Sequence, residues 1–411
     1  MEIRPILSAL MRSKTGAILV AMQVALSLAI LANALHIVNV RQEVAARPSG
    51  VAAEHEVFSL LARNMRPAGH NEQLALQKRQ AAVLRAVPGV VSVAQVSQIP
   101  LSRNGSTSGL SANRSEQKNT IPTAIYITPD TLIKTWGLQL VEGRDFTPGE
   151  IAEIDQNVTE EFPPQVIITR ALANKLHPGG GSMLNQPVFM GSGVGAQQLQ
   201  VVGVVDRLQT QGAETGQRGE YSMLTPVRLT GDNDTLLTVR AEAGQRDRVM
   251  KDAEQAIRAA SPGDVIVRVR TQDEERDKRY RADRALSWML ITVSTLLLLV
   301  TASGIVGIAS LWVTQRKKQI GVRRALGARR IDILRYFLTE NFMITSAGVA
   351  AGVLLALGLN HLLVSQLEMA RLPPGYLLAG ALVFWLLGVG AVYGPAWRAA
   401  SISPATATRS T

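Results

Sequence analysis

Four long stretches without a charged side chain constrain the fold of this chain more than any other feature of its sequence. They comprise residues 17–38, 285–313, 341–366 and 372–397. An α-helix rises about 1.5 Å per residue, so about 20 apolar residues cross the ~30 Å hydrocarbon core of a bilayer. One such stretch also fits a buried helix of a large soluble protein, but four together indicate a membrane protein. We therefore expect four transmembrane helices, at residues 17–38, 285–313, 337–366 and 376–396.

The first of these stretches has a second interpretation, as a cleavable signal peptide. Basic residues precede it, and Ala32, Asn33 and Ala34 resemble a small-residue cleavage site. Its apolar part is longer than the central region of a typical signal peptide, which favours a retained helix.

The net charge of +11 lies in three short segments beside the ends of these helices. Residues 1–14 carry +2, residues 315–336 carry +7 and residues 397–411 carry +2, and the rest of the chain is balanced. Lys and Arg are enriched in cytoplasmic loops, so we expect both termini in the cytoplasm. The cytoplasmic parts are then residues 1–16, 314–336 and 397–411, and the outer parts are residues 39–284 and 367–375.

A surplus of this size could also suggest binding to nucleic acid. No aromatic side chains that would stack on bases are interleaved with these charges, and we expect no nucleic-acid partner.

The outer segment, residues 39–284, is long enough for a folded α+β domain. Near its start a β-branched run, a helical run and a second β-branched run follow one another, and the same order recurs near its end. We interpret these as two β-α-β units, built from residues 56–62, 71–86 and 90–96 and from residues 236–240, 247–260 and 265–269. Together they would form one subdomain, from about residues 50–103 and 228–270.

Between the two units the sequence changes to short strand-like runs separated by Gly, Pro and Asn. We expect a β-rich insert at about residues 104–227, with strands at residues 124–127, 165–169, 186–190, 199–205 and 222–227, and loops at residues 103–120, 179–181 and 191–195. Residues 271–284 carry many charges of both signs and no Gly or Pro, which predicts a helical stalk that continues into the second transmembrane helix. A solvated charged linker is the alternative.

The basic loop predicts a short helix of its own. Residues 318–326 have helical character, and Gly327 supplies the left-handed residue that ends a helix. Val322, Ala325 and Leu326 would form an apolar stripe with arginines beside it. Such a helix can lie on the membrane surface or bind in a groove of a partner. The alternative is that the basic residues serve only to orient the chain in the membrane.

The loop sequence RKKQIGVRRALGARR resembles the signature of MacB/FtsX-type permeases, the membrane subunits of type VII ABC transporters. The matching residues are Ile320, Gly321, Arg323, Arg324, Ala325, Gly327 and Ala328, whereas Gln319 stands where the family has an acidic residue. The C-terminal sequence YGPAWRAASISPATA and the outer stretches TWGLQLVEGRDFTPGE, VIITRALANKLHPG and VVGVVD also look like the family, so the resemblance covers essentially the whole chain.

The resemblance implies a transport subunit of the bacterial inner membrane with its large domain in the periplasm. No G-x-x-x-x-G-K-[ST] sequence is present, so ATP and Mg²⁺ would bind to a separate cytoplasmic ABC ATPase, and this chain would hold no cofactor. The residues expected to couple to that ATPase are Lys318, Gln319, Ile320, Gly321, Arg323, Arg324, Ala325, Gly327 and Ala328. Because such ATPases act as dimers, a second copy or a sibling permease is implied, and a periplasmic membrane-fusion adaptor could join them.

The expected function is mechanotransmission, in which ATPase motion changes the outer domain and exports a peptide, lipopeptide, hydrophobic small molecule or lipoprotein. The alternative is an FtsX-like regulator that transmits the same motion to an extracytoplasmic enzyme without moving cargo.

The sequence offers little for other classes of function. There is no cysteine, the histidines are scattered, and we expect no catalytic or metal site. Ion-coupled transport needs ionisable residues inside the bilayer, for which Glu340 is the single candidate, at the inner edge of the third helix. Gly348 and Gly352 form a G-x-x-x-G spacing, which predicts close packing between helices.

Overall fold

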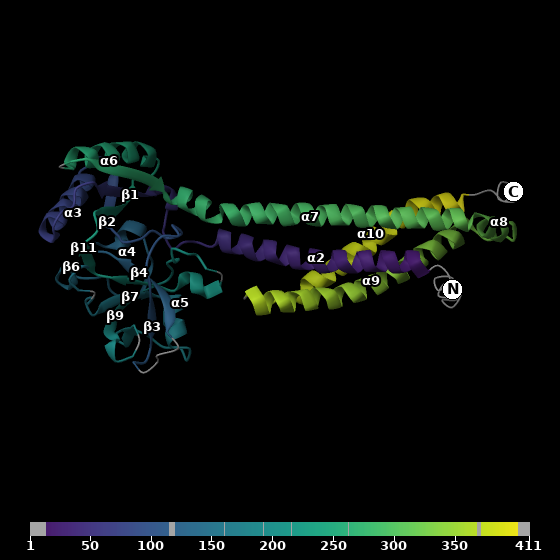
Figure 1. Cartoon of the computed structure of the whole chain (residues 1–411), viewed down its shortest axis with the longest axis horizontal. Helices are drawn as coiled ribbons and strands as arrows, with labels where there is room; N and C mark the ends of the chain where they lie inside the picture. The colour runs from purple at the N-terminus through teal and green to yellow at the C-terminus, as the bar shows by residue number, and fades with distance from the viewer. Residues whose placement is uncertain are drawn as a thin grey trace. The chain divides into compact units, whose positions relative to one another are not determined.

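The computed structural model describes residues 14–114, 120–159, 161–191, 193–214, 216–261, 263–367 and 371–401. The chain divides into two compact units (Figure 1). Unit 1 comprises Met1–Glu43 and Ala282–Thr411, and unit 2 comprises Val44–Arg281. Most of the expected N-terminal segment and C-terminal tail, and residues 368–370 of the short outer loop, lie outside the described residues.

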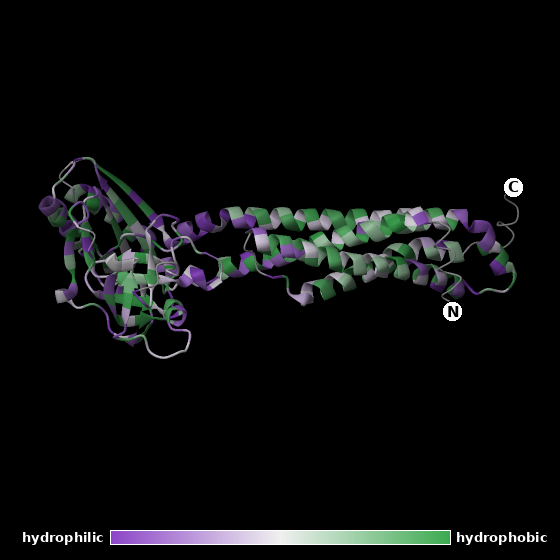
Figure 2. Ribbon diagram, turned by 60° about the horizontal axis from the view of Figure 1, so that its bottom comes forward, coloured by the Kyte–Doolittle hydropathy of each residue, from purple (hydrophilic) through white to green (hydrophobic). Residues whose placement is uncertain are grey.

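Unit 1 is built from four long apolar helices. They are α2 (Lys14–Ala46), α7 (Gln272–Gln315), α9 (Arg330–Leu367) and α10 (Pro374–Ala400). Each contains an 18-residue window with a mean hydropathy of 2.0 to 2.2, long and apolar enough to cross a membrane. Hydrophobic residues fill the middle of these helices, and hydrophilic residues gather toward their ends (Figure 2). All four predicted apolar helices are therefore present, and each continues past its charge-free stretch at one end or at both.

Close packing joins α9 to α2 at the two glycines of the G-x-x-x-G spacing. A Cβ atom at Gly348 would lie 2.7 Å from the carbonyl oxygen of Ala21, and one at Gly352 would lie 3.0 Å from the Cα atom of Ala25. Small residues allow membrane helices to approach one another in this way. The backbones are so near that no larger side chain fits without moving a helix.

Polar side chains add contacts between the same helices. The Ser27 hydroxyl lies 2.9 Å from the Thr301 hydroxyl, which joins α2 to α7. The Asn33 amide donates to the carbonyl oxygen of Ala356, at 3.1 Å, which joins α2 to α9. Such bonds contribute about 0.6 kcal/mol on average inside membranes, so each adds only a little to the contact between these helices.

Unit 2 contains a four-stranded antiparallel sheet with two helices on one face (Figure 1). Its strands are β1 (Val57–Asn64), β2 (Val90–Gln95), β12 (Asp234–Ala241) and β13 (Val265–Thr271), in the order β13-β1-β12-β2. Helix α3 (His70–Arg85) joins β1 to β2, and α6 (Arg246–Ala260) joins β12 to β13. Alternate residues of β1, Phe58, Leu60 and Ala62, enter the core beneath these helices.

The pairing of these strands differs from two separate β-α-β units. β12 lies between β1 and β2, and β1 lies between β12 and β13. Each helix therefore joins two parallel strands that leave a gap one strand wide, and a strand of the other unit fills that gap. The result is the split, ferredoxin-like arrangement, in which neither half forms a sheet alone.

The insert forms a second sheet that closes on itself. Its order is β5-β9-β7-β10-β4-β3-β8, and β8 also pairs with β9. The strands are β3 (Thr107–Ser111), β4 (Ile121–Ile127), β5 (Leu140–Gly143), β7 (Gln165–Thr169), β8 (Pro187–Met190), β9 (Gln197–Val205) and β10 (Ser222–Thr225). Closure removes the open edges of the strands from β9 to β8, while β5 stays paired on one side, with β9. A separate two-stranded parallel sheet pairs β6 (Ala152–Asp155) with β11 (Val227–Thr230).

Two predictions for the insert need correction. Residues 103–120 were expected to be a loop, but β3 lies within them and pairs with both β4 and β8. The expected strand at residues 222–227 is divided into β10 and β11, because Pro226 has no N–H to donate to a strand partner.

Trp136 joins the insert to the four-stranded sheet. It lies at the end of α4 (Leu132–Trp136), is 1% exposed, and donates from Nε1 to the Thr238 hydroxyl on β12, at 2.8 Å. Its ring meets that of Tyr126 on β4 edge to face, with 5.6 Å between the centroids. The same side chain thus contacts both sheets, which fixes one against the other.

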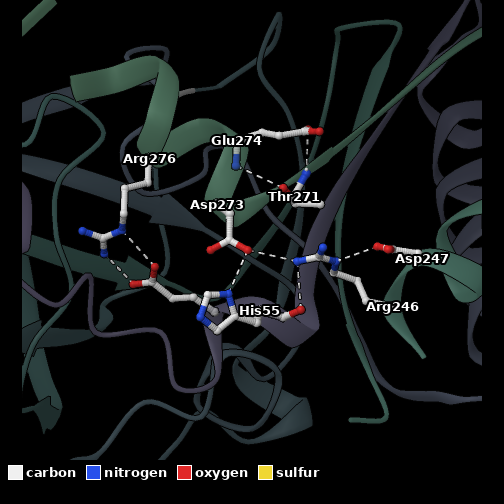
Figure 3. A network of polar contacts seen from close by, with 8 residues as sticks. His55, Arg246, Asp247, Thr271, Asp273, Glu274 and Arg276 are labelled. Atoms are coloured by element: carbon white, nitrogen blue, oxygen red, sulfur yellow. Dashed lines mark hydrogen bonds and ion pairs between the residues drawn. The ribbon is translucent and has the colours of Figure 1, made fainter. Parts of the chain in front are cut away.

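The charged stretch before the second apolar segment is helical, so the linker alternative is wrong. α7 begins at Gln272 and is continuous to Gln315. Thr271 caps it: the Glu274 N–H donates to the Thr271 hydroxyl, at 3.0 Å, and the Thr271 N–H donates to the Glu274 carboxylate, at 3.1 Å (Figure 3).

Ion pairs bind the first turns of α7 to the rest of unit 2 (Figure 3). Arg276 lies 2.6 Å from Glu54 and also donates to the backbone carbonyls of Ala45 and Arg47. Asp273 accepts from His55 and Arg246, at 2.9 and 3.0 Å. The start of α7 is thus held by several polar contacts at once.

Replacing Gly348 by Val should destabilise unit 1. The new methyl groups would meet α2, and overpacking of this kind costs about 1–3 kcal/mol. Gly358→Val on the same helix is the matched control, since a Cβ atom there meets nothing within 4 Å. The measurement is thermal unfolding in detergent, and equal unfolding temperatures for the two variants would contradict the close packing of α9 on α2.

Candidate functional site

A short helix, α8 (Lys317–Ala325), lies between the two long helices α7 and α9. The sequence predicted this helix at residues 318–326, so both predicted ends lie one residue too far along the chain. Its end is a Schellman motif, in which the Ala328 N–H donates to the Arg323 carbonyl and the Gly327 N–H donates to the Arg324 carbonyl, at 3.0 and 3.2 Å. Gly327 has a φ of +95°, which favours glycine, so the left-handed residue lies where the sequence places it.

One face of α8 packs on the helices of unit 1. Ile320 is 5% exposed and Gly321 is also buried. Ile320 belongs to the same apolar cluster as Ile333 and Phe337 of α9. The Arg323 guanidinium lies over the Tyr336 ring, 5.2 Å from its centroid, which adds a cation–π contact.

The opposite face of α8 is open. Val322 is 53% exposed and Leu326 is 83% exposed, and Lys318 and Ala325 lie beside them on the same face. We call Val322, Ala325 and Leu326 the apolar stripe. Gln319 is exposed as well, so the residue that departs from the family signature lies where a partner can reach it.

A buried ion pair holds the two helices that flank α8. Arg316 directly follows α7 and donates from Nη1 to both carboxylate oxygens of Glu340 on α9, at 2.9 and 2.7 Å. Glu340 is fully buried, and 16% of the Arg316 side chain is exposed. A carboxylate can be kept in such a place only with a partner of opposite charge. The pair therefore holds the end of α7 against the interior of α9.

The sequence singled out Glu340 as an ionisable residue at the inner edge of the third helix and missed Arg316 as its partner. The available signal was position: Arg316 is the first charge after one apolar stretch, and Glu340 is the last before the next. A short hairpin between two helices brings such residues together.

The residues predicted for ATPase coupling and for helix packing fall into two places. Those from Lys318 to Ala328 lie together on α8 and its end, and Gly348 and Gly352 lie further along α9, against α2. The Asp332 side chain accepts from the Arg329 N–H, at 3.0 Å, and so caps the start of α9. Within the described residues, no group of three His, Asp or Glu side chains could hold a metal ion.

Replacing Glu340 by Gln should lower the unfolding temperature in detergent, because Arg316 is left buried without its counter-charge. Removing one partner of a buried ion pair costs about 3–5 kcal/mol. The double variant R316Q/E340Q should recover part of this loss, and an additive loss would contradict the pairing. Glu254→Gln is the control, because its pair with Arg258 is exposed and such pairs contribute at most about 1 kcal/mol.

Comparisons with known proteins connect this geometry to a family. The MacB-like periplasmic core domain matches residues 17–270, more than half of the chain, and the FtsX-like permease C-terminal domain matches residues 291–404. One relative is the macrolide export ATP-binding/permease protein MacB of Chromobacterium violaceum, 29% identical over 65% of this chain and 40% of that protein. Another is the pyoverdine export ATP-binding/permease protein PvdT of Pseudomonas savastanoi pv. phaseolicola, 34% identical over 52% of this chain and 33% of that protein.

The chain thus spans well under half the length of these two relatives. The solved periplasmic region of MacB from Actinobacillus actinomycetemcomitans covers 58% of this chain at 12% identity, and its TM-score of 0.33 is too low to carry an argument about the fold. Because the two family matches cover unit 2 and most of the helices of unit 1, the chain belongs to the MacB/FtsX-type permeases of ABC transporters.

Proposed function

We propose that this chain is the permease subunit of an ATP-driven exporter and that a separate cytoplasmic ABC ATPase binds to α8. The observation that carries the proposal is the apolar stripe. Ile320 fixes one face of α8 to the long helices of unit 1, while Val322 and Leu326 on the other face are exposed. An amphipathic helix held in this way can enter a hydrophobic groove of a partner. Lys318 and Arg323 would add charge contacts at its rim.

In our proposal the ATPase binds ATP and Mg²⁺, and this chain binds neither. Both relatives described above are named ATP-binding/permease proteins, and the two matched parts of this chain are a periplasmic domain and a permease domain. Because residue 319 is a glutamine, α8 lacks the family's acidic residue at this position. A sibling permease in a heterodimer could supply one. A homodimer would present Gln319 twice.

The motion would pass to unit 2 along α7. This helix is continuous from Gln272 to Gln315, its first turns are bound by Arg276 and Asp273, and Arg316 at its other end is paired with Glu340. A helix without a break carries displacement along its axis better than a flexible linker does. ATPase closure would thereby change unit 2, which is mechanotransmission.

We place the protein in the bacterial inner membrane, with both termini and α8 in the cytoplasm and unit 2 in the periplasm. The +7 charge of residues 315–336 supports this orientation. The cargo would be a peptide, lipopeptide, hydrophobic small molecule or lipoprotein, and a membrane-fusion adaptor could bind on the periplasmic side. The relatives described above are named as exporters, so we propose export rather than regulation of an extracytoplasmic enzyme.

Leu326→Asp should prevent binding of the ATPase without unfolding the permease. The side chain is 83% exposed, so the change removes apolar contact area from the partner and not from the core. We expect at least about a tenfold loss of ATPase recovered with tagged permease, as for a central interface residue. Val158→Asp is the matched control, since Val158 is 81% exposed and lies in unit 2. Normal ATPase recovery with L326D would refute the role of the stripe.

The orientation can be tested by cysteine labelling, because the chain has no cysteine of its own. Val158→Cys should react with a membrane-impermeant maleimide in spheroplasts. Lys318→Cys should react only after the membrane is permeabilised, since α8 would lie inside. The opposite pattern of labelling would overturn the proposed topology.

A further inference from the structure

The loop that joins β2 to β3, residues 96–106, forms part of the wall of a cavity in unit 2. The cavity has a volume of about 640 Å³ and is lined by residues of the four-stranded sheet and of the insert. Gln98 and Ser102 of this loop belong to the lining, and so do Glu275 and Lys278 of α7. We call residues 96–106 the strap. The strap and the first turns of α7 thus line the same cavity.

The first turns of α7 hold the strap through a hydrogen bond and an apolar contact. The Gln272 amide donates to the carbonyl oxygen of Pro100, at 3.1 Å. Leu101 is 1% exposed and belongs to one apolar cluster with Tyr280 of α7, which is 2% exposed. Burial of two large side chains against each other stabilises the contact. The position of the strap therefore depends on α7.

A second loop, residues 207–214, lies against the strap, and we call it the brace. The Leu101 N–H donates to the carbonyl oxygen of Thr210, at 3.3 Å. The Arg103 N–H donates to the carbonyl oxygen of Gln211, at 2.9 Å. Two backbone hydrogen bonds thus join the strap to the brace.

α7 holds the brace as well. Arg279 donates from Nε to the carbonyl oxygen of Gly212, at 2.8 Å, and from Nη2 to that of Ala213, at 3.3 Å. Ala213 also belongs to the apolar cluster of Leu101 and Tyr280. The same helix therefore fixes both loops.

Both loops contain residues in a disfavoured backbone conformation. Five non-glycine residues in the described part of the chain have a positive φ, and three of them lie in the strap and the brace. These three are Leu101 at +69°, Arg103 at +63° and Ala213 at +47°. The Cβ atom of an L-residue is crowded by the next carbonyl oxygen in this region. Such strain persists only where surrounding contacts enforce it, and it gathers at segments that switch between conformations.

We propose that the strap is a strained latch, which the first turns of α7 hold closed and which relaxes away from the cavity when these turns move. The contacts that enforce the strain come from α7, and the strap is part of the cavity wall. A displacement of α7 would therefore change the cavity directly. The inference concerns unit 2 alone and does not depend on the ATPase.

The test is hydrogen–deuterium exchange of the full-length protein in lipid nanodiscs, without ATPase or ATP. Arg279→Gln removes both bonds to the brace. We expect amide exchange in the strap and the brace to become at least about tenfold faster, while exchange in β1 stays unchanged. Arg281→Gln is the matched control, because Arg281 is exposed two residues further along α7, and it should leave all three segments unchanged.

A second pair of variants tests the strain itself. The Arg103 side chain is exposed, so its replacement removes no core packing. Arg103→Gly relieves the crowding at Cβ, whereas Arg103→Ala keeps it. We expect exchange in the strap to be about threefold slower in R103G than in R103A, because glycine stabilises the closed conformation.

Unchanged exchange of the strap in R279Q, or an equal rise in β1, would overturn the dependence of the strap on α7. Exchange in R103G that equals or exceeds that in R103A would show a rigid clamp without stored strain, which would overturn the latch.

Discussion

Glu340 is a carboxylate without exposed surface, and the geometry around α8 depends on its ion pair with Arg316. A charge in such surroundings must be neutralised, so α7 and α9 cannot separate at this end without a large cost. This pair fixes the start of α8 against α9, and Ile320 then fixes the inner face of α8. The exposed apolar stripe follows from these two contacts, because a helix of nine residues has little stability alone.

In unit 2 the interleaved sheet and Trp136 hold segments that are far apart in the sequence in fixed positions. Because β12 fills the gap between β1 and β2, the N-terminal and C-terminal parts of unit 2 fold as one sheet, although the insert separates them in sequence. The Trp136 side chain then bonds to Thr238 and packs on Tyr126. The cavity with Glu275 lies where these two subdomains meet. It is therefore a product of packing between segments far apart in the chain.

Much of the fold could be predicted from the sequence, because its signals are local. Apolar length defined the four long helices, and Gly327 marked the end of α8. The strand β3 was missed because residues 107–111 are mostly small and polar, and it forms only through pairing with β4 and β8. Strand order was missed for the same reason: a helix between two strands does not reveal whether a third strand lies between them.

The sequence by itself determined that this chain crosses a membrane, where its positive charge gathers and which short helix carries the family signature. These follow from composition along the chain, since a bilayer selects uncharged segments of a given length. Tertiary structure alone decided that Arg316 pairs with Glu340, that Gly348 lies against Ala21, and that Trp136 bonds to Thr238. Each of these depends on distances between residues that are separate in sequence, and such distances are set only when helices and sheets pack together.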